Sequence, residues 1–137
     1  MKIIVQKFGG TSVATPQTRQ LVVKKVKEAV DAGYAPIVVV SAMGRRGDPY
    51  ATDTLIEMLR SVNPDPDVHE LDLMMACGEI ISSTVMASIL QKEGFKAKAL
   101  TGGQAGMVTD GSSRNRNLRL FGLSLSLRPF LATTPYR

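Results

Sequence analysis

Two periodicities of apolar residues predict the first elements of the chain. Residues 3–8 are typical of a short apolar strand, and a helix should follow with Thr15 as N-cap and Pro16 as its first residue. Proline is favoured there because its missing N–H has no partner in the first turn of a helix. The helical pattern continues to about Ala32, and Gly33 is a typical helix stop.

A second strand is expected at residues 37–40, where β-branched side chains follow one another without interruption. Such a run is typical of a strand that is covered on both faces. Strand, helix and strand in succession form a βαβ unit, in which the two strands lie parallel and the crossover is right-handed. The sequence therefore predicts an α/β fold with a mainly parallel sheet.

The middle of the chain is predicted to be helical. A helix is expected from about Thr52 to Val62, because the prolines within 63–67 would end any helix. Residues 68–76 form a short helical candidate that is rich in leucine and methionine. Gly78 is expected to interrupt it.

Glu79 is then expected to begin a longer helix, which Gly94 closes. Residues 96–100 are interpreted as a third strand, and 107–109 as a short extended piece. Alternating leucines and serines at 123–127 indicate one more strand.

Composition and length limit the possible classes of protein. The chain has 137 residues, 44% of them hydrophobic, which suits one domain with a modest core. No apolar run approaches the ~20 residues of a membrane span, and the start lacks the pattern of a signal peptide. The single Cys77 rules out an internal disulfide, and the lone His69 has no metal-spaced partners. We expect a cytoplasmic protein with no metal site and no membrane partner.

Charge is unevenly distributed along the chain. The net charge of +5 arises from arginines in the last 25 residues or so, since the first 112 residues balance their charges and no acidic residue follows Asp110. Nucleic-acid binding by the body of the domain is therefore not expected, and the arginine-rich tail leaves it open only as an alternative. We divide the chain into residues 1–111 and a divergent basic tail, 112–137, interpreted as out-of-frame sequence.

Lys7 and the pair Gly9-Gly10 stand where the first strand ends. Glycines let main-chain N–H groups approach phosphate oxygens, and an ammonium adds a point charge. Such groups stabilise the charge that develops during phosphoryl transfer. The alternative is a plain strand-to-helix turn that needs glycine for its tight geometry. Neither a Walker A loop nor a dinucleotide-binding glycine pattern is present.

Three further polar residues are candidates for binding. Ser41 ends the second strand, on the side where open α/β sheets bind ligands. Thr52 is either a helix-capping or a ligand-binding hydroxyl. Glu79 either gains from the dipole of a helix that begins there or recognises a substrate ammonium.

Five blocks of sequence resemble, in the right order, the amino-terminal part of aspartate kinases, which belong to the amino-acid kinase superfamily. They are VQKFGGTSV, VVVSAMG, ATDTLIEM, MMACGEIISSTVMASIL and LTGGQAGMVTD. The resemblance implies the N-terminal lobe of the amino-acid kinase fold, a partial three-layer αβα sandwich with a mainly parallel sheet. It also implies phosphorylation of the side-chain carboxylate of L-aspartate by ATP with Mg²⁺, a step toward lysine, threonine and methionine.

By the same resemblance, Lys7 is the catalytic residue that stabilises the transferred phosphoryl group. The cofactor ATP would be bound by Lys7, Phe8, Gly9 and Gly10. The substrate L-aspartate would be bound by Ser41, Thr52 and Glu79.

The resemblance decays from about Ser112, and the family's G-R-G-G-S-D segment and regulatory domains have no counterpart. We interpret the chain as a truncated aspartate kinase with little or no activity alone. The alternative is a non-catalytic fragment that binds aspartate or phosphate and needs a separate remainder. Because a truncated sheet exposes an unpaired edge, we expect a homo-oligomer.

Overall fold

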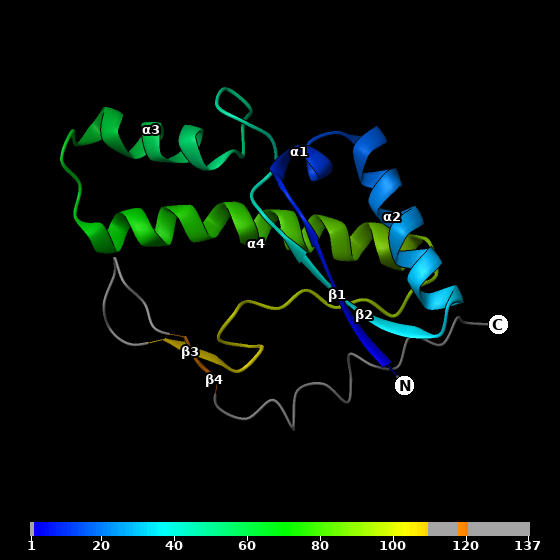
Figure 1. Cartoon of the computed structure of the whole chain (residues 1–137). Coiled ribbons are helices and arrows are strands. Elements are labelled where there is room, and N and C mark those ends of the chain that lie inside the picture. Colours follow the sequence, from blue (N-terminus) through cyan, green and yellow to red (C-terminus); the bar gives the residue numbers. More distant parts are fainter. Residues whose placement is uncertain (1, 110–117, 121–137) are drawn as a thin grey trace.

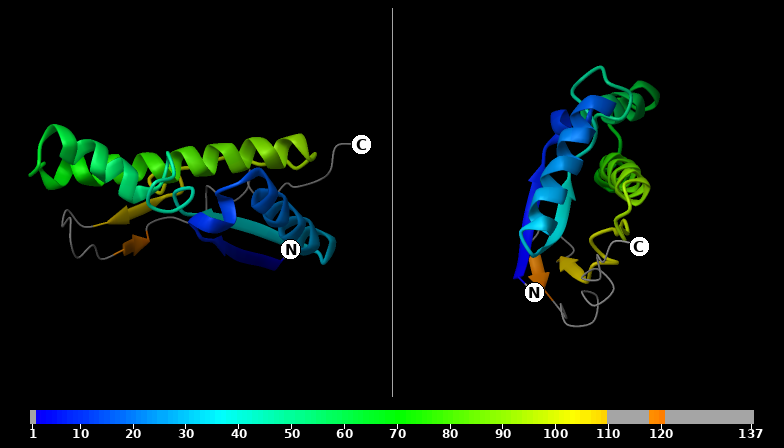
Figure 2. Two further views of the ribbon diagram at one scale, coloured as in Figure 1. Left: turned by 90° about the horizontal axis from the view of Figure 1, so that it is seen from above. Right: turned by 90° about the vertical axis from the view of Figure 1, so that its right-hand side faces the viewer.

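The computed structural model describes residues 2–109 and 118–120. The elements in these ranges are β1 (Lys2–Phe8), α1 (Gly10–Val13), α2 (Pro16–Asp31), β2 (Tyr34–Val40), α3 (Thr52–Val62), α4 (Val68–Lys92), β3 (Met107–Thr109) and β4 (Leu118–Leu120). Figure 1 shows β1, α2 and β2 as one unit and α3 and α4 as a helical hairpin. α4 runs along the length of the molecule, with one end beside α3 and the other beside α2 and β2 (Figure 2).

β1 and β2 form a parallel pair, with a register that runs from Lys2 opposite Tyr34 to Phe8 opposite Val40. The crossover between them is α2, so the predicted βαβ unit is confirmed. Parallel strands cannot be joined by a tight hairpin, and a helix packed on the sheet is their usual connection. Both strands therefore end at the same edge of the sheet, where the functional residues were expected.

The ends of α2 follow from local chemistry. Thr15 and Thr18 form a capping box, in which the Thr15 hydroxyl accepts a bond of 3.2 Å from the Thr18 N–H and the Thr18 hydroxyl accepts one of 3.1 Å in return. Pro16 is the first helical residue, and α2 ends at Asp31 with Ala32 as its C-cap, just before Gly33. The predicted start and stop of this helix are confirmed.

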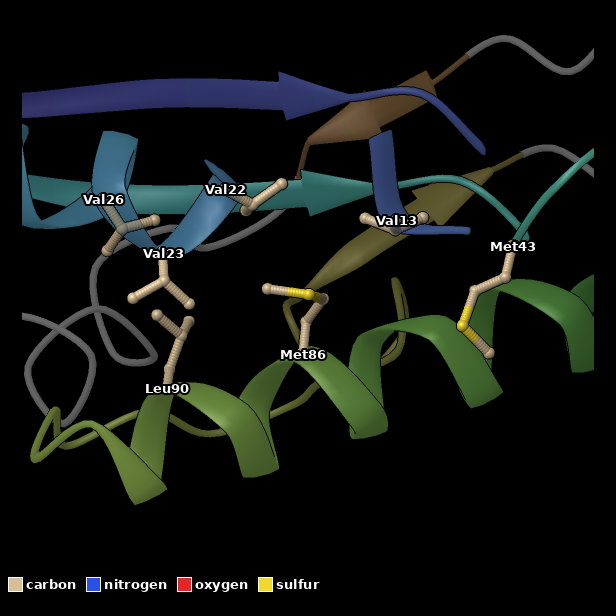
Figure 3. Packing of buried hydrophobic residues seen from close by; sticks show 7 residues of the cluster. All are labelled: Val13, Val22, Val23, Val26, Met43, Met86 and Leu90. Carbon is tan, nitrogen blue, oxygen red and sulfur yellow. The ribbon is translucent and has the colours of Figure 1, made fainter. Parts of the chain in front are cut away.

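The hydrophobic core lies between α2, the C-terminal half of α4 and one face of the sheet. Seven buried side chains form it: Val13, Val22, Val23, Val26, Met43, Met86 and Leu90 (Figure 3). Phe8, Val38 and Val40 pack against this cluster from alternate strand positions. The βαβ unit and the C-terminal half of α4 thus share one core.

The other face of the sheet is covered only in part: Ala35, which stands opposite Ile3 on this face, is 1% exposed, but other apolar side chains of the face are not buried. The side chains of Ile3, Val5 and Val39 are 45%, 63% and 41% exposed. The prediction that residues 37–40 are covered on both faces is therefore wrong for this chain. Because successive strand residues point to opposite faces, Val38 and Val40 reach the core whereas Val39 faces outward.

α4 is one continuous helix, so the prediction of two helices separated at Gly78 is wrong. Gly78 lies inside α4 and is buried. A Cβ atom there would lie 2.7 Å from the Cβ of Ala42 and 3.2 Å from Cδ1 of Leu55. The glycine therefore permits a close approach of α4 to its neighbours instead of ending a helix.

By length and composition alone, α4 would also be able to cross a membrane. This is a weak indication, because the core helix of a soluble protein passes the same test. α4 buries Ser82, Met86 and Leu90 along one side, at the spacing of a core-facing helix. The absence of a membrane partner stays a prediction.

The remaining predicted strands have mixed outcomes. Residues 96–100 form no regular element, so the predicted third strand is wrong. Among the described residues no strand lies beside them as a ladder partner, and the Ala97 carbonyl accepts a bond of 2.8 Å from the Gln91 side chain instead. The extended piece at 107–109 is confirmed as β3, which pairs antiparallel with β4. The predicted strand at 123–127 lies outside the described residues, as does most of the tail.

Candidate functional site

A hollow of about 420 Å³ lies where the chain leaves the sheet after β2. Three residues singled out from the sequence line it: Gly10, Ser41 and Thr52. They come from α1, from the end of β2 and from the first turn of α3. Ligands of open α/β sheets bind beyond the carboxyl ends of parallel strands, so the hollow has the position expected of a binding site.

Gly10 is required by the packing of the hollow's wall. Its carbonyl accepts a bond of 2.9 Å from the Gly44 N–H. A Cβ atom on Gly10 would lie 2.5 Å from the Ala42 carbonyl oxygen and 2.7 Å from that of Gly44. These contacts give Gly10 a packing role, because only a glycine allows the loop after β2 to approach so closely.

Gly9 is in a different situation. Its φ of −73° and ψ of 170° suit any residue, and no atom lies within 4 Å of the position that a Cβ would take. Packing within the chain therefore does not demand a glycine here. With no side chain and no neighbouring atom in the way, the main chain at Gly9 is accessible to a phosphate group.

Thr52 does not cap α3. The N-cap is Ala51, whose side chain makes no capping bond, and Thr52 is the first helical residue. The capping alternative for Thr52 is therefore wrong. Its half-buried side chain lines the hollow, and its hydroxyl makes no hydrogen bond with any described residue.

Glu79 lies beside the same hollow. Its Oε1 accepts a hydrogen bond of 3.3 Å from the main-chain N–H of Ala42, which lines the hollow. Since α4 begins at Val68, about three turns earlier, Glu79 is too far from the helix N-terminus to gain from the dipole. The dipole alternative is thereby excluded, and the exposed carboxylate keeps its other oxygen free of bonds to the described residues.

Lys7 and Phe8, also singled out from the sequence, do not line the hollow. Lys7 stands opposite Val39 in the sheet, with an exposed side chain that does not line the hollow. Phe8 packs against the core, and its carbonyl accepts a bond of 3.2 Å from the Ser41 N–H. The structure thus gathers Gly10, Ser41, Thr52 and Glu79, whereas the side chain of Phe8 serves packing.

Sequence reasoning missed two arginines that line the hollow, Arg45 and Arg46. Arg46 forms an ion pair with Glu57 of α3, and the N–H of Arg45 donates a bond of 2.8 Å to the Asp48 carboxylate. These contacts hold the loop between β2 and α3 in place. The segment is recognisable as a polar loop, but no sequence signal says which of its side chains face the hollow.

The sequence model of the amino acid kinase family matches residues 2–125. The chain belongs to the amino acid kinase family. Among its relatives, Aspartokinase 1 of Bacillus subtilis is 52% identical over 118 residues, which cover 86% of this chain and 29% of that protein. The Aspartokinase of Geobacillus stearothermophilus is 40% identical over 121 residues, which cover 86% of this chain and 28% of that protein.

A solved structure agrees with this membership. The crystal structure of aspartate kinase from Synechocystis superposes with a TM-score of 0.69 at 37% identity, over 78% of this chain and 17% of that one. The α/β amino-acid kinase fold expected from the five blocks is confirmed. The chain spans less than a third of the length of these relatives. The boundary at residue 111 stays a prediction.

Proposed function

We propose that this chain is part of an aspartate kinase, which transfers a phosphoryl group from ATP to the side-chain carboxylate of L-aspartate. One observation carries the proposal: a single hollow joins Gly10, Ser41 and Thr52, and Glu79 adjoins it through Ala42. The likeness to aspartokinases supports it. The homologous part is short, so the activity of the chain alone is expected to be absent or weak.

The hollow suits a small amino acid with charges of both signs. The free oxygen of Glu79 would accept hydrogen bonds from the α-ammonium of aspartate, and a charge-assisted bond of this kind is among the stronger ones. The hydroxyls of Ser41 and Thr52 would orient the carboxylates. Holding the acceptor carboxylate in one orientation lowers the entropic part of the barrier to transfer.

The phosphate side of the site would be formed by residues 7–10. The open space above Gly9 fits an approaching phosphate, and Lys7 makes no ion pair within the described ranges. ATP, when bound, supplies the γ-phosphoryl group. The Lys7 ammonium would stabilise the negative charge that spreads over its oxygens during transfer.

Mg²⁺ is proposed only as a companion of ATP. Within residues 2–109 and 118–120, no three side chains of His, Cys, Asp or Glu are grouped to hold a metal ion. Mg²⁺ in phosphoryl-transfer sites is bound mainly by substrate phosphates, with one or two protein carboxylates. The residues present therefore fit Mg²⁺ carried by the nucleotide and supply no separate metal site.

Calorimetric titration of L-aspartate, and separately of ATP with Mg²⁺, into the whole chain tests this function. We expect L-aspartate to bind, Glu79→Gln to weaken that binding at least about tenfold, and Lys7→Ala to weaken ATP binding. Coupled measurement of ADP release would show weak or no turnover, and any turnover should vanish in Lys7→Ala. A folded chain that binds neither ligand, or binds L-aspartate equally well after Glu79→Gln, would contradict the proposal.

The second candidate function is a non-catalytic fragment that binds aspartate or phosphate. The short matched region favours it, because this region makes up only 29% of one aspartokinase relative and 28% of the other. It predicts ligand binding without turnover. A cytoplasmic location and a homo-oligomer remain our proposals for its setting, and sedimentation velocity would test the second.

A further inference from the structure

Arg19, near the start of α2, connects this helix to two other segments of the chain. Its Nη1 donates a hydrogen bond of 2.8 Å to the Val13 carbonyl and one of 3.1 Å to the Ala14 carbonyl, at the C-terminal end of α1. The same nitrogen lies 3.5 Å from Sδ of Met43, in the loop after β2. The guanidinium therefore contacts α1 and this loop at the same time.

The two segments that Arg19 contacts also form part of the wall of the hollow. Gly10 is the first residue of α1, Gly44 follows Met43 in the loop, and both glycines line the hollow. The N–H of Gly44 donates a bond of 2.9 Å to the Gly10 carbonyl. α1 and the loop are thus joined at two places, by this bond and by Arg19.

α1 depends on such contacts for its position. It has only four residues, and a single helical turn is not stable by itself. The last carbonyls of a helix have no partner within the helix. Arg19 supplies donors to two carbonyls at this end, and hydrogen bonds from a charged donor are stronger than those from a neutral one.

The position of Arg19 also carries a cost in stability. Within the described ranges its half-buried side chain forms no ion pair, and its Nε is buried without a hydrogen-bond partner. A buried donor without a partner is unfavourable, and a methionine at this position would leave none. The bonds to α1 offset part of this cost, and what they secure is the position of α1.

We propose that Arg19 is a positioning residue, which holds α1 against the loop after β2 and so sets the spacing between Gly10 and Ser41 across the hollow. Arg19 does not line the hollow, so it acts through these neighbours. The inference rests on the proposed function, in which residues 9–10 meet phosphate and Ser41 meets L-aspartate. Spacing matters there, because a misplacement of ~1 Å between reacting groups can lower a rate by about two orders of magnitude.

Amide hydrogen exchange on the whole 137-residue chain tests this role without any ligand. Exchange at the Gly44 N–H reports how often its bond to the Gly10 carbonyl opens. Arg19→Met keeps most of the apolar stem and removes the donors, so we expect exchange at Gly44 to become at least about tenfold faster. Amides in the middle of α2 and β2 should exchange as in the unchanged chain, whereas a general loss of stability would accelerate them too.

Calorimetry on the same variants measures the consequence for binding. ATP with Mg²⁺ should bind Arg19→Met about tenfold less tightly, because the main chain at residues 9–10 is no longer held in place. Arg19→Lys keeps a positive charge and donors on a shorter side chain, and should restore part of both effects. The matched control is Arg60→Met, since Arg60 is exposed in the last turn of α3 and does not line the hollow. It should change neither measurement.

The outcomes separate this inference from its alternatives. If exchange at Gly44 is unchanged in Arg19→Met, or rises only together with that of the core amides, the proposal is wrong. Faster exchange at Gly44 with unchanged affinity for ATP would also overturn it, as would an Arg19→Lys variant no better than Arg19→Met. If the unchanged chain binds neither ATP nor L-aspartate, the proposed function fails, and exchange at Gly44 alone decides whether Arg19 holds the wall of the hollow.

Discussion

The carboxylate of Glu79 accepts a hydrogen bond from the main-chain N–H of Ala42, with 3.3 Å between Oε1 and the nitrogen. One residue earlier, Gly78 leaves room for the Cβ of the same Ala42. Two neighbours on α4 therefore fix the loop that follows β2, the glycine by lacking a side chain and the glutamate by its acceptor. This contact holds Glu79 at the hollow although Glu79 lies about three turns after the start of α4.

Substitutions of Glu79 should separate two roles of its carboxylate. One is the hydrogen bond from the Ala42 N–H, and the other is the proposed charged contact with the α-ammonium of L-aspartate. Glu79→Gln keeps an oxygen that can accept the bond from the Ala42 N–H, so thermal stability should be nearly unchanged. Glu79→Ala removes the bond and should cost about 0.5–1.5 kcal/mol. Both variants should bind L-aspartate less tightly. Thermal unfolding and calorimetry on the same samples measure the two effects, and a Gln variant with full affinity would remove Glu79 from the substrate site.

The two glycines after β1 should respond differently to alanine. Gly10→Ala places a Cβ 2.5 Å from the Ala42 carbonyl oxygen and should destabilise the chain by about 1–3 kcal/mol. Gly9→Ala meets open space at a permitted backbone conformation and should be neutral, or stabilising by about 0.4–1 kcal/mol. Chemical denaturation gives both values. If Gly9→Ala keeps stability and also keeps ATP binding, the bare main chain there has no role in holding phosphate.

Gly78 should be intolerant of alanine although alanine is the better helix former. In an unhindered helix the change would gain about 1 kcal/mol. In α4 the added methyl would lie 2.7 Å from the Cβ of Ala42, so we expect a net loss of about 1–3 kcal/mol. Cys77→Ala, at the adjacent exposed position, is the control and should change little. Equal unfolding midpoints for the two variants would contradict this prediction. They would show that α4 can move away from Ala42 without loss of stability.

The pair Lys25–Glu28 on α2 provides a pH-dependent contact. The hydrogen bond from the Lys25 ammonium, 2.7 Å long, lowers the pKa of Glu28 below its ordinary value of 4.5, and the charges of Lys25 and Lys24 act in the same direction. Because the pKa is lower in the folded state, the contribution to stability is present above pH 4.5 and is lost as the pH falls through the folded pKa.

Lys25→Met should therefore raise the pKa of Glu28 toward 4.5, as measured by NMR titration of its side-chain carboxyl carbon. Lys27→Met is the matched control, because Lys27 pairs with Asp31 at 3.0 Å and is not among the groups that lower this pKa. An unchanged pKa in Lys25→Met would show that the ion pair is absent in solution.

Much of the candidate site could be predicted because the ends of parallel strands meet at one edge of a sheet. From this rule, Gly10 and Ser41 were expected to lie close together, and both line the hollow. Thr52, at the start of α3, lines it as well. The arginines of the loop could not be assigned in this way. Asp48 shapes the turn at Arg45 locally, but the direction of the Arg46 side chain depends on its ion pair with Glu57 of α3, eleven residues further along the chain.

The sequence by itself determined the features that depend on neighbours in the chain. The capped start of α2 at Thr15, its stop at Gly33 and the βαβ order all follow from local hydrogen bonding and apolar periodicity. Tertiary structure alone decided the meaning of Gly78, the continuity of α4 and the failure of 96–100 to form a strand. A glycine breaks a helix or admits a neighbour depending on what packs against it, and an extended segment becomes a strand only beside a partner that completes its hydrogen bonds.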